Sequence, residues 1–219
     1  MPPDSESASP VLSFAEARVL GCLIEKEMST PEYYPLTLAA LTAACNQRSN
    51  RDPVVQWDEK SAEAAMTGLR RQRLGALISQ AGARVPKYKH TLERVFDSLD
   101  PGMKAVLCEL LLRNVQTLSE LRSRTDRLHA FPSSDAVEDS VMKLVNYGAG
   151  PLASVLPPGS GRRVKCYAHL LCGAVDAQTP VHAGQAVEIP PSEDWKAKVE
   201  TELAGLRREI EQLKTALGV

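Results

Sequence analysis

The hydrophobic residues of the chain recur at helical spacing in segments that come in a repeated order. The first segment opens at Ser13, where Glu16 completes the pattern of a capping box three residues later. A second segment follows the pair Asp100 and Pro101, which is a good helix start. The apolar positions are Phe14, Ala17, Leu20 and Ile24 in the first segment, and Met103, Val106, Leu107, Leu110 and Leu111 in the second. This spacing predicts two amphipathic helices.

The two halves of the chain match each other in the order of their segments. The matched helical pairs are VLGCLIEK (19–26) with VLCELLLR (106–113), TLAAL (37–41) with TLSEL (117–121), and AEAAMTGL (62–69) with VEDSVMKL (137–144). The matched strand pairs are LISQ (77–80) with LASVL (152–156), and YKHTL (88–92) with YAHLL (167–171). Because loop lengths differ while the order holds, the sequence predicts two copies of helix–helix–helix–strand–loop–strand. Thr37 and Thr117 are the expected N-caps of the second helices.

Three helices followed by a β-hairpin is the plan of a winged-helix domain, a relative of the helix-turn-helix. The predicted fold class is therefore mainly α with small β-hairpins (α+β), as two tandem winged-helix domains at residues 12–93 and 100–172. Residues 1–11 are polar and are expected to be disordered. Residues 173–194 are rich in alanine, glycine and proline without a period, which is typical of a linker.

Residues 195–219 are predicted to form one more helix, with a heptad pattern. Its apolar positions, candidates for dimerisation, are Val199, Leu203, Leu206, Ile210, Leu213 and Leu217. In a parallel pair Glu202 would face Arg207 of the other chain, and Glu209 would face Lys214. Both pairs have opposite charges, so the pattern favours a coiled-coil homodimer. Three heptads are short, and the alternative is that this helix packs on its own domains.

Composition and charge exclude some classes of protein. Of the 219 residues 43% are hydrophobic and 24% are charged, which is typical of a globular protein. No apolar run approaches the roughly 20 residues that span a bilayer, and the first residues lack the pattern of a signal peptide, so we expect a cytoplasmic protein without membrane contact. The net charge is −1. Residues 13–92 have 11 basic against 8 acidic residues, and residues 100–172 have 9 against 7, so both blocks are mildly basic.

The residues that usually form metal or catalytic sites are scattered. The five cysteines (Cys22, Cys45, Cys108, Cys166 and Cys172) form no CxxC pair, and the four histidines show no HxxxH pattern. The sequence also lacks a glycine-rich phosphate loop and a GxSxG motif. We therefore expect no metal, no cofactor and no catalysis. An activated thiol at Cys45 is the weaker alternative, either as a nucleophile or as a redox sensor.

An unusual polar cluster, ACNQRSNRDPVV (44–55), lies between the second and third helices of the first copy. In a helix-turn-helix protein this connection precedes the helix that enters the major groove. The candidate ligand-binding residues are Asn46, Gln47, Arg48, Asn50 and Arg51. The alternative is a structural turn, because asparagine and serine bond to nearby backbone and Pro53 prevents the helix from continuing.

The third helices and the hairpins give further candidates. Both third helices begin with acidic residues (Asp58, Glu59 and Glu63; Asp135, Glu138 and Asp139), which disfavours contact with DNA there, although acids also suit a helix N-terminus. Basic residues lie instead at the end of the third helix (Arg70, Arg71, Arg73) and in the two hairpins (Arg84, Lys87, Lys89; Arg162, Arg163, Lys165). Such residues are suited to phosphate contacts, but charged residues also protect sheet edges and helix ends.

Several segments together resemble one family. LGCLIEKEMSTPEYYPLTLAALTAACNQRSNRDPV, VPKYKH, VLCELLLR, LSELRSRTDRLHAF and YAHLL are similar to the YceH-like family of tandem winged-helix proteins, over roughly residues 12–172. That family is uncharacterised, so the resemblance implies the fold and leaves the activity open. Two functions remain as hypotheses: a transcription-regulator-like protein that binds double-stranded DNA, and a scaffold that binds a protein partner.

The heptad pattern generates a test of dimerisation. Deletion of residues 195–219 is expected to convert a dimer into a monomer in which both winged-helix domains stay folded. Glu209→Lys should weaken the dimer modestly, and more at low salt, because exposed helix pairs are worth about 0.2–0.5 kcal/mol each. Adding Lys214→Glu should restore it. Sedimentation equilibrium at two salt concentrations measures both effects, and a truncated protein that stays dimeric would mean that the seam is intramolecular.

Overall fold

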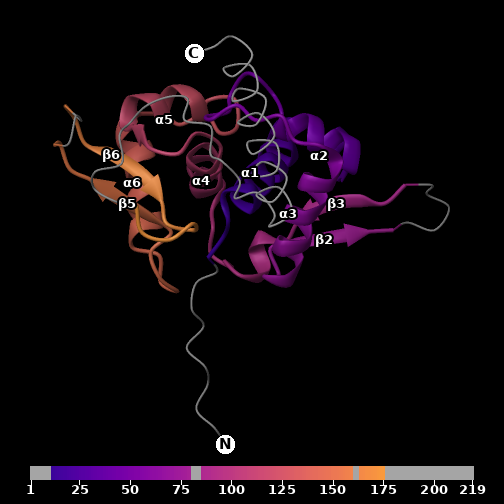
Figure 1. Ribbon diagram of the computed structural model, residues 1–219. Coiled ribbons are helices and arrows are strands. Elements are labelled where there is room, and N and C mark those ends of the chain that lie inside the picture. Colours follow the sequence, from indigo (N-terminus) through magenta and orange to yellow (C-terminus); the bar gives the residue numbers. More distant parts are fainter. Residues whose placement is uncertain (1–10, 80–84, 160–162, 176–219) are drawn as a thin grey trace, which may run out of the picture. The chain divides into compact units, whose positions relative to one another are not determined.

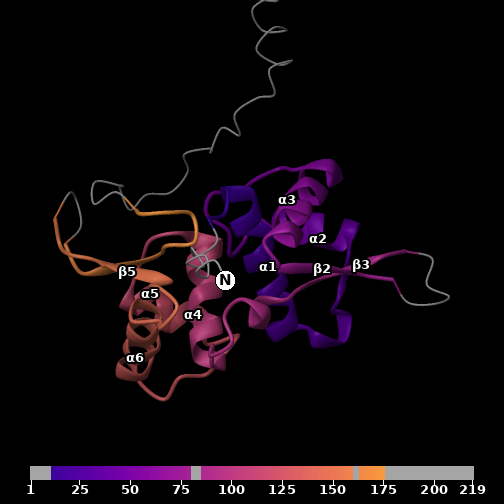
Figure 2. The same ribbon diagram turned by 90° about the horizontal axis from the view of Figure 1, so that it is seen from below.

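In the computed structural model (Figures 1 and 2) the protein is a mixed α/β structure with small antiparallel sheets. The structure describes residues 11–79, 85–159 and 163–175. Contacts group the chain into a unit from Met1 to Gln185 and a unit from Ala186 to Val219, and every described residue belongs to the first. No described helix is both long enough and apolar enough to cross a membrane.

Both halves of the described chain have the order helix, strand, helix, helix, strand, strand. The first repeat comprises α1 (Phe14–Ser29), the 3-10 turn η1 (Pro31–Tyr33), β1 (Leu36–Thr37), α2 (Leu38–Cys45), α3 (Glu59–Arg71), β2 (Gly75–Ile78), β3 (Lys87–His90) and the turn η2 (Leu92–Arg94). The second comprises α4 (Pro101–Arg113), β4 (Gln116–Thr117), α5 (Leu118–Thr125), α6 (Ser134–Val145), β5 (Ala153–Leu156) and β6 (Cys166–His169). The strand orders are β1-β3-β2 and β4-β6-β5, so the last strand of each repeat is central.

The predicted helix starts are confirmed. Ser13 and Glu16 form the capping box of α1, Asp100 caps α4 before Pro101, and Thr37 and Thr117 cap α2 and α5. The expected order was incomplete, because the sequence pattern did not reveal β1 and β4. These strands are two residues long, too short to show alternation, and they exist only because β3 and β6 pair with them.

The first helices of the two repeats, α1 and α4, lie side by side in both views (Figures 1 and 2). Gly21 permits this approach, because a Cβ atom there would lie 2.9 Å from Cδ2 of Leu112. The Cys108 thiol donates to the carbonyl of Gly21 across the contact. Buried side chains of both repeats form one continuous core. The repeats therefore share a core instead of each burying its own.

A buried ion cluster joins the repeats beside this helix contact. The carboxylates of Glu25 in α1 and Glu109 in α4 are fully buried. Arg127 bridges them: Nη1 lies 2.7 Å from Oε1 of Glu25, and Nη2 lies 2.7 Å from Oε1 of Glu109. Arg113 lies 3.5 Å from the other oxygen of Glu109. Buried charges need such partners, since an unpaired one costs several kcal/mol.

The pKa values of the two carboxyl groups in the cluster are shifted in opposite directions. Burial opposes the charge of Glu25, but the hydrogen bonds and charges of Arg51 and Arg127 outweigh it and lower the pKa of that carboxyl. Burial raises the pKa of Glu109. Arg127 and the more distant Arg113 lower this pKa, but they offset the effect of burial only in part. Glu25 is therefore the better-compensated anion of the cluster.

Arg51 brings the polar loop between α2 and α3 into this cluster. Its guanidinium donates to both carboxylate oxygens of Glu25, to the carbonyl of Ala44 at 3.0 Å and to Oε1 of Gln47 at 2.9 Å. Its side chain is fully buried. The loop also contacts the second repeat, where the amide of Asp52 donates to the carbonyl of Leu112 at 3.0 Å. The loop is thus part of the joint between the repeats.

The joint predicts different outcomes for two neighbouring arginines. Arg51→Ala leaves Glu25 with one partner fewer in a buried site and is expected to destabilise the protein by about 3–5 kcal/mol. Arg48 is exposed and has no side-chain partner among the described residues, so Arg48→Ala should change stability by less than about 0.5 kcal/mol. Urea unfolding followed by circular dichroism measures both. Equal midpoints for the two variants would contradict a structural role for Arg51.

Candidate nucleic-acid interface

The polar loop places its candidate residues in two environments. Asn46 holds the start of α3 in place: its Nδ2 donates to the carbonyl of Trp57 at 2.7 Å, and its Oδ1 accepts from the Trp57 amide at 2.8 Å. Asn50 has a left-handed backbone (φ 58°) and accepts from Arg113 through its side chain. Arg51 and Gln47 are bonded inside the joint. The hypothesis of a structural turn therefore explains most of the loop. Arg48 is the fully exposed member of this set.

The end of α3 presents the next three candidates. Arg70, Arg71 and Arg73 are exposed, and their side chains have no hydrogen bond or ion pair with another described residue. Arg73 lies in the turn after the helix with φ 62°, and its carbonyl accepts from the hydroxyl of Thr91. The chain then enters β2 directly. The three arginines therefore lie next to the hairpin of the first repeat.

Lys87 and Lys89 lie on the outer face of that hairpin. They alternate with Tyr88 and His90, which are buried, so the lysines point away from the core. The register places Ile78 opposite Lys87 and Ala76 opposite Lys89, so no carboxylate faces them across β2. Neither lysine side chain has an ion pair within the described residues. The outer face of this sheet is open and positively charged.

This arrangement disagrees with the edge-protection hypothesis for these lysines. Charged residues protect sheet edges because an edge strand has unpaired backbone groups. β3, however, is the central strand, with β1 on one side and β2 on the other. The sequence pattern did not predict that β3 is central, because β1 is too short to show a strand pattern. Edge protection therefore does not explain Lys87.

Two lysines of the second repeat are paired with carboxylates. Lys165, just before β6, lies close to Oε1 of Glu138 in α6, and the Tyr167 hydroxyl donates to the same oxygen at 3.0 Å. Lys143, also in α6, pairs with Asp100 at 2.9 Å. Arg163 is exposed and has no partner among the described residues. The two repeats therefore share a fold pattern but differ in available positive charge.

The sheets of the two repeats also differ on their outer faces. All four residues of β6 are buried, which is different from the alternation in β3. Cys166 and Ala168 belong to a small separate apolar cluster with Val115 and Leu156, and Val175 packs against it. The chain after β6 thus covers this face, whereas the corresponding face of the first repeat is cationic and open.

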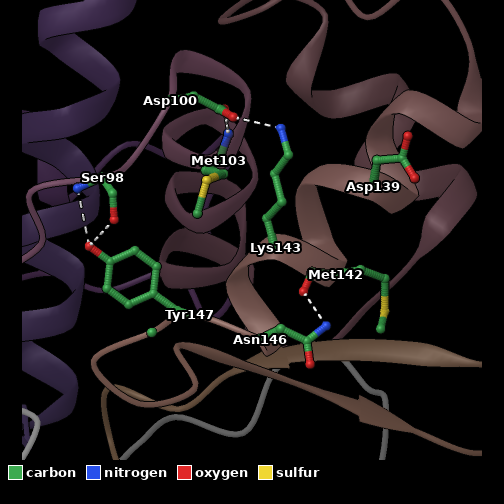
Figure 3. Close-up of a pocket in the computed structure, with 9 residues that line it drawn as sticks. Ser98, Asp100, Met103, Asp139, Met142, Lys143, Asn146 and Tyr147 are labelled. Carbon is green, nitrogen blue, oxygen red and sulfur yellow. Dashed lines mark hydrogen bonds and ion pairs between the residues drawn. The ribbon is translucent and has the colours of Figure 1, made fainter.

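A cavity of about 660 Å³ lies between the start of α4 and the end of α6 (Figure 3). Several of its polar groups bond to one another. The Tyr147 oxygen accepts from the amide and hydroxyl of Ser98 at 3.2 and 3.0 Å. Asp100 caps α4 and pairs with Lys143, as Figure 3 shows. Asp139 also lines the cavity and is exposed, without a hydrogen bond or ion pair to another described residue.

A group of three side chains suited to metal binding lies at the end of β3. Glu27, His90 and Glu93 bring their ligand atoms within 4.8 Å of one another. The two carboxylates, however, face opposite ring nitrogens: Glu27 lies 2.8 Å from Nε2, and Glu93 lies 3.8 Å from Nδ1. Nδ1 also accepts from the Leu92 amide, and Glu93 pairs with Lys104 of α4. This geometry favours a hydrogen-bonded link between the repeats over a metal site.

Four of the five cysteines are buried, including Cys45. These are Cys22, Cys45, Cys108 and Cys166, which form no disulfide among the described residues, and Cys172 is exposed. The pKa of the Cys45 thiol is raised by its hydrogen bond with Cys22 and by burial. Burial likewise raises the pKa of Cys172 to about 11. A thiol that keeps its proton is a poor nucleophile, so Cys45 does not have the features of an activated cysteine.

Some candidates fall outside the described residues. These are Arg84 and Arg162, and the six heptad positions Val199, Leu203, Leu206, Ile210, Leu213 and Leu217. The site that the described residues form is therefore the end of α3 together with the outer face of β3.

Comparison with known proteins gives the family of the chain. A family described as "Protein of unknown function, DUF480" matches residues 12–162. UPF0502 proteins of Pelobacter propionicus and Geotalea uraniireducens are 46% and 47% identical over 208 and 215 residues, covering 93% of this chain in both cases and 94% and 97% of the relatives. A UPF0502 protein of Aeromonas hydrophila is 41% identical over 213 residues. The chain therefore belongs to the DUF480 family of UPF0502 proteins.

Proposed function

We propose that the protein is a transcription-regulator-like DNA-binding protein that contacts double-stranded DNA through its first repeat and performs no catalysis. One observation supports this most directly. Arg70, Arg71, Arg73, Lys87 and Lys89 lie along the end of α3 and the outer face of β3, exposed or partly exposed, without ionic partners in the described structure. Unpaired cations with no structural task are suited to phosphate groups, which dominate the affinity of proteins for DNA.

The element order supports a winged-helix fold for each repeat. Three helices, a short first strand between the first two helices, and a terminal hairpin with its last strand central are the parts that such a domain needs. This agrees with the resemblance to the YceH-like family of tandem winged-helix proteins. In the proposal, α3 has the position of the recognition helix in the fold, and the β2–β3 hairpin has that of the wing.

The proposal includes a homodimer that acts in the cytoplasm. The heptad positions at residues 195–219 would pair two chains, and pairing would place two first repeats on one duplex, as helix-turn-helix dimers do. Two cationic faces on one duplex would double the number of phosphate contacts and so steepen the salt dependence of binding.

A second candidate function is a scaffold for a protein partner, and the second repeat favours it. A groove of about 490 Å³ lies between the starts of α5 and α6 and the strand β6. Val164 lines it and is 54% exposed, next to the neutralised pair of Lys165 and Glu138. An exposed apolar side chain beside compensated charges suits a protein surface better than a phosphate. Pull-down from a cell lysate with and without nuclease separates the two functions.

The DNA proposal predicts a specific loss in the first repeat. Lys87→Ala with Lys89→Ala is expected to weaken binding to all duplex sequences alike. It should also flatten the slope of log K against log salt by about 1.8, since each phosphate contact contributes about 0.9. Fluorescence anisotropy with a labelled duplex at several salt concentrations measures both quantities.

The matched control removes the same charge from the second repeat. Lys143→Ala with Lys165→Ala also deletes two lysines, but both are paired with carboxylates in the folded protein. Affinity and slope should therefore change little in this variant. If both double variants lose affinity equally, net charge rather than the outer face of β3 controls binding, and the proposed interface is wrong.

A further inference from the structure

The start of α3 is acidic, and its charged residues are exposed. Asp58 caps the helix: its Oδ1 accepts from the amide and the hydroxyl of Ser61 at 2.9 and 2.7 Å. These bonds lower the pKa of Asp58, so its carboxylate stays charged at neutral pH. Glu59 and Glu63 are also exposed, and Lys60 is the cation among them. The first two turns of the helix therefore present net negative charge to solvent.

The middle of α3 is tied to the hairpin. The pKa of Tyr88 is raised by burial and by the nearby charge of Glu63, while Arg70 acts in the opposite direction. Both charges thus act on the hydroxyl of a buried strand residue. In the second repeat the matching tyrosine, Tyr167, donates a hydrogen bond directly to Glu138. Glu138 is therefore tied to its own hairpin, whereas Glu63 remains exposed.

Positive charge exceeds negative charge only at the end of the helix. Arg73 is three residues before Ala76, so their backbones are at most about 11 Å apart. Ala76 pairs with Lys89, and Lys87 lies two residues further on the same face. The cations therefore lie in two neighbouring places, at the end of α3 and on the outer face of β3.

We infer that the first repeat contacts the sugar-phosphate backbone of duplex DNA through β3 and the end of α3, with the start of α3 outside the major groove. The protein then binds duplexes of any sequence. This inference rests on the proposed function and specifies its ligand. In helix-turn-helix proteins the first residues of the recognition helix contact base edges. Here those residues are carboxylates, which phosphates repel, and the cations that would replace them are suited to backbone contacts, which do not depend on sequence.

The test uses a bulky probe at the start of the helix. Ala64 is exposed on α3, and Ala64→Tyr adds a side chain that would block insertion of this helix into a groove. Ser123→Tyr, on an exposed position of α5 in the second repeat, is the matched control. Affinities of the wild type and both variants are measured by anisotropy on a panel of short duplexes of unrelated sequence, at two salt concentrations. Circular dichroism confirms that each variant is folded.

The expected result is wild-type affinity within about threefold across the panel, steep salt dependence, and no loss in either tyrosine variant. Loss of binding in folded Ala64→Tyr alone, or preference for one sequence by about a thousandfold, would overturn the inference while leaving DNA binding in place. Absence of duplex binding by the wild-type protein would overturn the proposed function and this inference together. Lys87→Ala with Lys89→Ala separates these cases further, because it should reduce affinity on every duplex equally.

Discussion

The contact of Glu25 with Arg51 and Arg127 determines how the two repeats are held. Burying the Glu25 carboxylate is tolerable only with cations in place, and these come from different parts of the chain: Arg51 from the loop after α2, and Arg127 from the segment after α5. Because Arg127 also binds Glu109, the interaction fixes the second repeat against the first. The helix contact of α1 with α4 buries apolar side chains, and the ion cluster adds a polar link between the repeats.

This joint explains the polar loop that is so conspicuous in the sequence. A segment rich in asparagine, glutamine and arginine usually suggests a ligand-binding surface. Here Asn46 fixes the backbone at Trp57, and Arg51 is buried against Glu25. The loop is polar because it must compensate a buried carboxylate and satisfy backbone groups where two repeats meet. Its polarity serves the interior of the protein, and of its two arginines Arg48 is the exposed one.

The joint also has a consequence for the surface. Since the repeats are held together, they need not have the same task, and their hairpins differ. Lys165 and Lys143 are neutralised by acidic neighbours, and Val175 packs against the outer face of the second sheet. The first sheet has Lys87 and Lys89 on its outer face, without ion pairs among the described residues. The sheets of the two repeats thus differ in charge, although Arg163 of the second hairpin is also exposed.

The sequence alone determined the helices, their caps and the repeat, because these depend on local spacing and on nearby side chains such as Ser13 with Glu16 and Asp100 with Pro101. It also showed where basic residues gather. Only the tertiary structure decided which of these are free. Arg51 and Lys165 look alike in sequence to Arg48 and Lys87, but their partners, Glu25 and Glu138, are 26 and 27 residues away. The central position of β3 likewise depends on β1. This strand forms only because it pairs with β3, which lies 50 residues further along the chain. Charge compensation and strand pairing at such separations leave no local pattern, so the open face of the first sheet could be recognised only in the folded protein.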